Sequence, residues 1–266
     1  MKIFDCITFY DENLITNARF EILNEVVDHH IICESIYDHS GNKKEINFEL
    51  INNKFKDKIF HLVLSEPFPN PINQWDNERI QRDYLFKGIQ NAKPNDIILF
   101  SDSDEIPDPK KLKNFQLNKK FAIFFQKFFT YKINIFNKHE TPWEGTRAIK
   151  KKDLKGFNYL RKKVLSKNMK KNFLRIDLEK DIEIIHDGGW HFNNLYSLEK
   201  LSQKIKISPH QEFNKKTFYQ KEKIKEKIEN LQDLYGKGYV YEKLMLDDSF
   251  PTFIKENRNL FKDYIL

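Results

Sequence analysis

Three acidic side chains are concentrated in four consecutive residues, Asp102-Ser103-Asp104-Glu105. They follow residues 97–100, an apolar run with the length and composition of a buried strand. Carboxylates this close repel one another, and a divalent cation relieves that repulsion. Hard oxygen ligands suit Mg²⁺ or Mn²⁺, which can bridge the phosphates of a nucleotide and neutralise a departing diphosphate. The run therefore predicts a metal and nucleotide site at the end of a strand.

The elements that position this run alternate between strand-like and helix-like patterns over the first 110 residues. Such alternation predicts βαβ units and a mostly parallel sheet. We expect strands at 2–9, 30–33, 58–64 and 97–100, and helices at 13–27 and 75–91. In open α/β sheets ligands bind outside the carboxyl ends of the strands, which is where the acidic run lies.

The remainder of the chain differs in pattern. Aromatic-rich strands are expected at 121–129 and 131–136, another strand at 182–185, and helices beyond residue 189, including 221–234. We interpret the whole, 1–266, as a single α/β domain with a nucleotide-binding half at 1–110 and a second half at 111–266.

Composition restricts the class of protein. Apolar residues make up 39% of 266, enough for a core, and no apolar stretch approaches the roughly 20 residues of a membrane span. Asp5 interrupts any hydrophobic region of a signal peptide, so the chain is expected to be cytoplasmic. Cys6 and Cys33 are expected to be reduced thiols in the core of neighbouring strands.

Positive charge is concentrated between Lys150 and Lys171, where ten Lys or Arg residues accompany one acid, Asp153. The stretch is either a solvated face or a surface for an anionic partner. Because aromatic residues do not alternate regularly with the basic ones, nucleic acid is not an expected partner. Lipid phosphate is the partner that would place the protein at the inner face of a membrane.

A resemblance to a known family rests on the acidic run and the two residues after it, Asp102-Ser103-Asp104-Glu105-Ile106-Pro107. This sequence resembles the Asp-x-Asp-Glu-Ile-Pro signature of glycosyltransferase family 17. Further segments resemble the family in the same order: Val27-Asp28, Ile32-Cys33-Glu34-Ser35, Gly41 with Lys43 or Lys44, Trp75, Arg79 and Arg82, Gly189-Trp190-His191-Phe192, and 251–259.

The resemblance implies a GT-A type fold, which is a Rossmann-like mixed sheet flanked by helices. It also implies that the protein binds a UDP-sugar and a divalent metal, and that transfer inverts the configuration at the anomeric carbon of the sugar. By position, Asp104 would be the direct metal ligand, and Asp102 would hold the ribose or a metal-bound water. Glu34 and Lys43 would lie near the nucleotide. Arg82 could reach it as well, because a guanidinium binds phosphate with two hydrogen bonds.

His191 has three readings: a second protein ligand to the metal, an acceptor-binding residue, or a structural histidine. It follows Gly188-Gly189, whose backbone permits close approach to a ligand, and His210 is the competing candidate. Trp190 could stack on a sugar or pack in the core.

Inverting transfer needs a carboxylate that takes the proton from the acceptor hydroxyl. Glu212 is the first candidate for this catalytic base, because the corresponding position of the family also looks acidic. Asp187 and Glu105 follow it, although the position of Asp187 looks apolar in the animal relatives.

The function expected is transfer of a sugar, with UDP-GlcNAc as the donor implied by the family. Animal members are anchored in the Golgi, and this chain shows no anchor, so the expected acceptor is a polysaccharide, a lipid-linked oligosaccharide or a protein glycan. Two other functions fit parts of the sequence. A Mg²⁺-dependent nucleotidyl- or phosphotransferase would use the acidic run but has no glycine-rich phosphate loop, and a basic binding module without catalysis would leave that run unused.

Overall fold

The computed structural model describes residues 1–69, 73–206 and 220–266. These residues form two compact units, the first made of 1–126 and 144–189 and the second of 127–143 and 190–266. The division does not follow the expected one near residue 110, because the chain leaves the first unit at residue 127 and returns to it at 144. The expected single domain stays a prediction.

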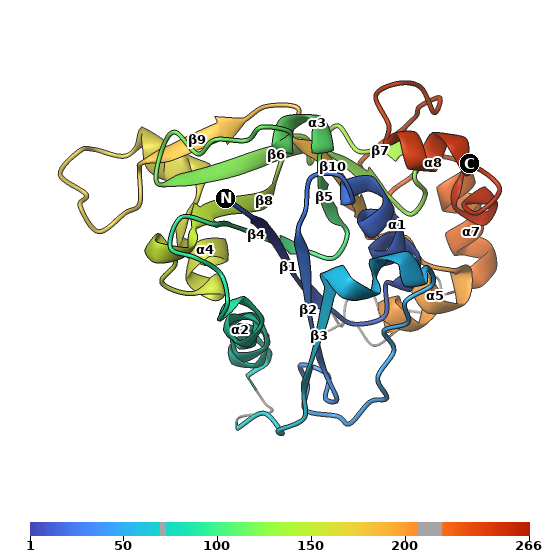
Figure 1. The fold of residues 1–266 in the computed structure, drawn as a ribbon. Helices are drawn as coiled ribbons and strands as arrows, with labels where there is room; N and C mark the ends of the chain where they lie inside the picture. The colour runs from blue at the N-terminus through green and yellow to red at the C-terminus, as the bar shows by residue number, and fades with distance from the viewer. Residues whose placement is uncertain (70–72, 207–219) are drawn as a thin grey trace. The chain divides into compact units, whose positions relative to one another are not determined.

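The first unit is built on four parallel strands, β1 (Ile3–Phe9), β2 (His29–Ser35), β3 (Ile59–Leu64) and β4 (Ile97–Asp102). Strand β1 lies between β2 and β4, and β3 pairs with the outer side of β2 (Figure 1). Strand β8 (Trp143–Lys150) pairs antiparallel with β4, which makes the sheet mixed. The expected α/β fold, a mixed sheet flanked by helices, is confirmed.

Two further strands extend this sheet within the first unit. Strand β6 (Phe121–Thr130) lies beside β8, and β9 (Ile182–Ile185) pairs parallel with β6, with Phe121 opposite Ile182. The last four residues of β6 belong to the second unit. Short elements follow the acidic run, namely β5 (Glu105–Pro107) and α3 (Pro109–Leu112).

The helices of the first unit are shorter than the sequence pattern indicates. Helix α1 (Asn13–Leu23) stops four residues before the expected end, because the amides of Val26 and Val27 both bond to the Leu23 carbonyl and close a turn. Helix α2 (Gln74–Tyr84) continues only as the 3₁₀ turn η2 (Leu85–Ile89). The remaining helical elements are η1 (Asn53–Lys58), η3 (Lys151–Asp153), α4 (Phe157–Lys163) and η4 (Ser166–Lys170).

The core of this unit covers both faces of the sheet, since alternate residues of a strand point to opposite sides. Cys6 and Ile31 pack with Phe157 of α4 on one face, whereas Ile7 and Phe20 pack together on the other. Both cysteines are buried and unbonded, as expected.

The second unit consists of the end of β6, β7 (Ile135–Phe136), β10 (Gly189–Asn193), β11 (Glu242–Lys243), α5 (Leu198–Lys206), α7 (Lys221–Glu229), α8 (Thr252–Glu256) and η6 (Lys262–Tyr264). The expected strand at 131–136 was wrong in length, because Tyr131 has a positive φ and leaves only two residues paired. The helix expected at 221–234 ends early for a similar reason, since Leu231 also has a positive φ. The segment 251–259, which resembles the carboxyl-terminal helix of the family, is helical only over Thr252–Glu256. No helix within the described parts of the chain has the length and apolar character to span a bilayer.

Candidate active site at the carboxyl end of β4

The acidic run lies where several parallel strands end. In the register of the sheet, Thr8 of β1 is opposite Asp102 of β4, and Phe9 is opposite Glu34 of β2. Parallel strands that are aligned in this way leave the sheet at one edge, which is the place where α/β folds bind ligands. The position expected for the acidic run is confirmed.

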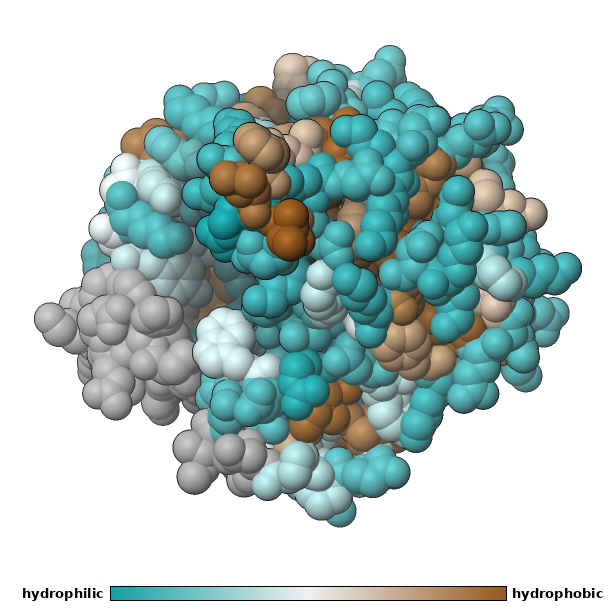
Figure 2. Space-filling model, turned by 90° about the vertical axis from the view of Figure 1, so that its left-hand side faces the viewer, coloured by the Kyte–Doolittle hydropathy of each residue, from teal (hydrophilic) through white to brown (hydrophobic). Residues whose placement is uncertain are grey.

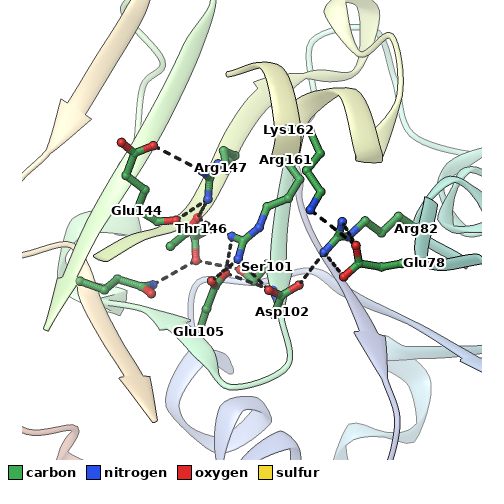
Figure 3. A network of polar contacts seen from close by, with 12 residues as sticks. Glu78, Arg82, Ser101, Asp102, Glu105, Glu144, Thr146, Arg147, Arg161 and Lys162 are labelled. Carbon is green, nitrogen blue, oxygen red and sulfur yellow. Dashed lines mark hydrogen bonds and ion pairs between the residues drawn. The ribbon is translucent and has the colours of Figure 1, made fainter. Parts of the chain in front are cut away.

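Arg161 on α4 binds two acids of the run at once (Figure 3). Its Nη2 donates to Asp102 Oδ2 and to Glu105 Oε1, each at 2.7 Å, and its Nη1 donates to Glu105 Oε2 at 3.0 Å. Glu105 Oε2 also accepts from the backbone amide of Asp102 at 3.1 Å. The Glu105 carboxylate is fully buried. The first and last acids of the run are therefore fixed by one guanidinium and one amide.

Asp102 keeps contact with solvent, since 34% of its side chain is exposed. Burial of the carboxyl raises its pKa, Glu105 and Asp104 raise it further, and Arg161 and Arg82 act in the opposite direction. Burial lowers the pKa of Arg161, but Asp102 and Glu105 raise it by more, so the guanidinium stays charged. In this site Arg161 is paired with two carboxylates, and of these Asp102 is partly accessible to solvent.

Arg82 lies near the other carboxylate oxygen of Asp102, and its own side chain is only 4% exposed. Its two terminal nitrogens donate to the Glu78 carboxylate at 2.7 Å each, and Nη2 is 3.7 Å from Asp102 Oδ1. Glu78 and Arg82 are four residues apart, the spacing that brings two side chains together on one helix face. Lys162 reaches the same glutamate at 3.6 Å and lies over the ring of Trp75, which is 72% exposed. A row of cations thus borders the acidic run.

Asp104 contributes to a second group of acids at the same edge. Burial raises the pKa of Glu12, and the nearby charges of Asp104 and Asp11 raise it further. Glu12 also accepts hydrogen bonds at 3.1 Å from the amides of Tyr10 and Asp11, just after β1. Asp104 is partly exposed. Asp104 therefore lies close enough to Glu12 for their charges to interact, and metal binding by Asp104 stays a prediction.

A fully buried cluster of charged side chains, Asp5, Arg19 and His30, contacts the acidic run from the interior of the first unit. Arg19 of α1 donates to both carboxylate oxygens of Asp5 at 2.7 and 2.6 Å, to Ser101 Oγ at 3.0 Å and to the Glu105 carbonyl at 2.5 Å. His30 Nδ1 is 2.9 Å from Asp5. Burial alone would raise the pKa of Asp5, but Arg19 and His30 hold it well below its usual range. Arg19 joins α1 to the backbone of the run.

Hydrogen bonds also tie β4 to β8 beside the run. Ser101 Oγ of β4 lies 2.8 Å from Thr146 Oγ1 of β8, and within β8 Arg147 donates to the Glu144 carbonyl (Figure 3). Burial and the neighbouring charge of Arg161 lower the pKa of Arg147 to about 10. These contacts stabilise the ends of β4 and β8, the strands next to Arg161 and the acids.

Glu34 is placed near the same edge, at the end of β2, and its carboxylate is fully buried. It accepts from Lys44 Nζ at 2.6 Å and the Asn47 amide at 2.7 Å, and His61 Nε2 lies at 3.3 Å. Burial would raise its pKa, but hydrogen bonds from His61 and Lys44 lower it. Of the two lysines considered, Lys44 makes this contact and Lys43 is exposed. Through these contacts Glu34 holds residues 44–47 in place. A contact between the nucleotide and Glu34 or Lys43 stays a prediction.

The turn before β10 packs on the segment that follows the acidic run. The Asp108 amide donates to the Gly188 carbonyl at 2.8 Å. Gly189 has φ +135°, and a Cβ placed on it would lie 2.1 Å from the Ile106 carbonyl oxygen. Asp187 is exposed in this turn with φ +48°. Position 189 therefore requires glycine for steric and conformational reasons.

Comparison with known proteins identifies the family of the chain. The model of glycosyltransferase family 17 matches residues 1–251. The chain belongs to this family. It is 28% identical over 116 residues to the β-1,4-mannosyl-glycoprotein 4-β-N-acetylglucosaminyltransferase of Rattus norvegicus, which covers 40% of the chain and 22% of that relative. The match thus spans about a fifth of the relative's length.

Solved structures show weaker similarity. Glucosyl-3-phosphoglycerate synthase from Mycobacterium tuberculosis has a TM-score of 0.39 at 12% identity, over 96% of this chain and 91% of that one. A glycosyltransferase involved in glycosylation of the major capsid of PBCV-1 has a TM-score of 0.33 at 13% identity, over 70% and 82%.

Two predicted site residues of this family 17 chain, Trp190 and His191, lie in the second unit. His191 is nearly buried between the rings of Phe128 and Trp143, at centroid distances of 4.5 and 4.9 Å. Trp190 is buried and donates to the Ser249 carbonyl at 2.8 Å, which favours core packing over sugar stacking. His210 and Glu212 lie outside the described residues. Metal binding by His191 stays a prediction.

Sequence reasoning missed the arginines that organise the site. Arg161 was included only in the basic stretch, and Arg19 only in a helix. A signal was present for Arg19, because it lies among apolar positions of its helix while Asp5 interrupts an apolar strand. Two opposite charges inside apolar elements indicate a buried pair.

Proposed function

We propose that this protein transfers a sugar from a UDP-sugar, UDP-GlcNAc first among candidates, to a glycan, polysaccharide or lipid-linked acceptor with inversion, on a GT-A type fold. Family membership supports sugar transfer. The choice of GlcNAc is supported by the name of the rat relative, an N-acetylglucosaminyltransferase, of which the chain matches 22%.

The observation that carries the proposal is the acidic run itself, held at the carboxyl end of β4 by Arg161. A diphosphate carries negative charge that acids alone would repel, so the site needs cations beside them. Arg82, Arg161 and Lys162 are those cations. We infer that Arg82, the arginine 3.7 Å from Asp102 Oδ1, donates to the phosphates of the donor while Arg161 holds Asp102 in position.

The residues present fit a divalent cation of the Mg²⁺ or Mn²⁺ type. Among the described residues, no three His, Cys, Asp or Glu side chains are grouped so that they alone could hold a metal ion. Mg²⁺ is usually held by one or two carboxylates together with substrate phosphates and water, which is what a run of this kind offers. We propose Asp104 as the direct ligand and Asp102 as its neighbour. When bound, the cation would neutralise the charge of the leaving diphosphate.

The proton of the acceptor hydroxyl needs a separate carboxylate. Glu105 is the least suited by geometry, because it is buried and bound to Arg161. Asp187 is exposed, and Glu212 lies outside the described residues. We keep Glu212 as the first candidate for the base, on the resemblance alone.

A donor screen tests the proposal. Thermal melting with UDP-GlcNAc, UDP-Gal, UDP-Glc or GDP-mannose, each with and without Mn²⁺, should show metal-dependent stabilisation by one UDP-sugar. In Asp104→Ala we expect donor affinity in Mn²⁺ to fall by at least about 10- to 100-fold, the usual cost of losing a group that supports a metal site. Asp57→Ala, which removes an exposed acid of η1, is the matched control and should change nothing.

Two outcomes of the screen would count against parts of the proposal. If no nucleotide sugar stabilises the wild-type protein under any condition, sugar transfer from these donors is refuted. If a UDP-sugar stabilises it equally without metal, and Asp104→Ala binds normally, the metal role of Asp104 is refuted while the donor class stands.

A further inference from the structure

The loop between η4 and β9 exposes large apolar side chains. Every residue from 169 to 177 is exposed, and Phe173, Leu174 and Ile176 are exposed by 82, 69 and 93%. We call these three residues the apolar tip. In Figure 1 the loop is the yellow segment that extends away from the sheet beside β9. Grouped apolar side chains on a surface usually mark a site of interaction with a partner or a membrane.

The loop has its own hydrogen bonds. The Leu174 amide donates to Asn172 Oδ1 at 3.0 Å, and the Arg175 amide donates to the Asn172 carbonyl at 3.0 Å. Lys180 Nζ donates to the same carbonyl at 2.5 Å. At the base, the buried Asn168 side chain donates to the Lys163 carbonyl at 2.7 Å. A defined turn therefore carries the apolar tip.

The charges around the apolar tip are mainly positive. Lys167, Lys170 and Lys171 are exposed just before it. Of the nearby acids, Asp177 binds Arg175 at 2.6 Å, and Glu179 accepts from Tyr159 and Lys155, the latter at 3.0 Å. Figure 2 faces this side of the molecule and shows brown apolar groups protruding among teal hydrophilic ones. The surface combines apolar groups with neighbouring cations.

We propose that residues 167–176 bind an anionic lipid surface, with the apolar tip inserted at the boundary of headgroups and acyl chains and the lysines on the lipid phosphates. Apolar groups flanked by Lys or Arg are what an interfacial membrane contact requires. A protein partner would be expected to use a broader surface. The contact shares only residues 167–171 with the stretch expected at 150–171, because Arg161 and Lys162 earlier in that stretch bind the acids of the site.

Vesicle binding by the whole chain tests the proposal without any donor or metal, so its failure is separate from failure of the proposed transfer. We expect co-sedimentation with vesicles of phosphatidylcholine and phosphatidylglycerol, and little with phosphatidylcholine alone. Phe173→Ser combined with Ile176→Ser should weaken binding about 10-fold or more, because both apolar contacts are lost. The matched control Ile51→Ser removes a side chain that is 68% exposed elsewhere in the first unit, and it should bind as the wild type does.

Insertion can be measured separately from attraction. Phe173→Cys can be labelled with an environment-sensitive dye, because the two native cysteines are fully buried. The dye should report an apolar environment on anionic vesicles and an aqueous one in their absence. Lys170→Glu with Lys171→Glu should reduce binding, and this reduction should be largest at low ionic strength.

Three results would overturn the proposal. The first is wild-type protein that stays in the supernatant with anionic vesicles at low salt. The second is binding that depends on the lysines but not on the apolar tip, which would indicate simple electrostatic adsorption. The third is a concentration-dependent oligomer that Phe173→Ser with Ile176→Ser dissociates, which would make the tip a contact between two copies of the chain.

Discussion

Two clusters of the first unit each centre on an arginine bound to carboxylates, and they differ in how completely they are closed. Arg19, Asp5 and His30 are fully buried, and Arg19 makes four hydrogen bonds within the protein. Around Arg161, Asp102 remains 34% exposed and Arg82 lies at a distance of 3.7 Å. The closed cluster is suited to support the fold, whereas the open one leaves part of the Asp102 carboxylate accessible to a ligand.

The difference also predicts how substitutions act. A charge removed from a closed cluster leaves its partner buried without compensation, and the folded state bears that cost. A charge removed from an open cluster can be replaced in part by water, so stability falls less and ligand binding falls more. Three substitutions can break or sharpen this contrast.

The largest effect on stability is expected for Arg19→Met. It leaves the Asp5 carboxylate buried without its main partner, and the free energy of unfolding should fall by about 3–5 kcal/mol. Urea unfolding followed by circular dichroism measures it. Arg175→Met is the matched control, since Arg175 also binds Asp177 with two nitrogens but both side chains are more than half exposed. That control should cost far less, because water replaces the lost contact. Equal costs would refute the contrast.

A smaller effect on stability, combined with an effect on binding, is expected for Arg161→Lys. Lysine keeps the charge but cannot donate to Asp102 and Glu105 together, so stability should fall by about 1–3 kcal/mol. Because Asp102 is then less well positioned, UDP-sugar affinity measured by calorimetry in Mn²⁺ should also fall. Arg79→Lys changes an exposed arginine of α2 and serves as the control. If donor affinity is unchanged in Arg161→Lys, Arg161 stabilises the fold and does not contribute to donor binding.

The smallest effect is a dependence of stability on pH. Burial lowers the pKa of His30 although Asp5 opposes it, so the unfolded chain takes up a proton near pH 6.5 that the folded chain resists. Stability is thus fully present above about pH 6.5 and decreases as pH falls, with Asp5 adding to the loss below about pH 4. Melting at pH 7.5 and 5.5 should show this decrease in the wild type. In His30→Gln the decrease should be smaller, and an unchanged decrease would assign it to other groups.

The parts of the site that sequence could predict are those set by local pattern. An apolar strand followed directly by acids fixes the place of Asp102 and Asp104, because a parallel strand ends at a known edge of the sheet. The spacing of Glu78 and Arg82 likewise predicts their pairing on one helix face. These features need only neighbouring residues.

The parts that sequence could not predict depend on contacts between distant segments. Arg161 meets Asp102 across 59 positions, and Arg19 meets the Glu105 carbonyl across 86. Within a run of ten basic residues, charge alone does not distinguish the arginine that turns inward from those in solvent. Helix ends were overestimated because turns, such as that closed by the Leu23 carbonyl, interrupt apolar patterns that continue.

Gly189 connects two segments that are far apart in the sequence. Any larger side chain at this position would collide with the Ile106 carbonyl, one residue after Glu105, because its Cβ would lie 2.1 Å away. A substitution at position 189 would therefore displace the backbone next to the acidic run and alter the run indirectly. In protein engineering, residue 189 and residues 102–105 should therefore be treated as one set. When segments of related enzymes are recombined, both should come from the same parent.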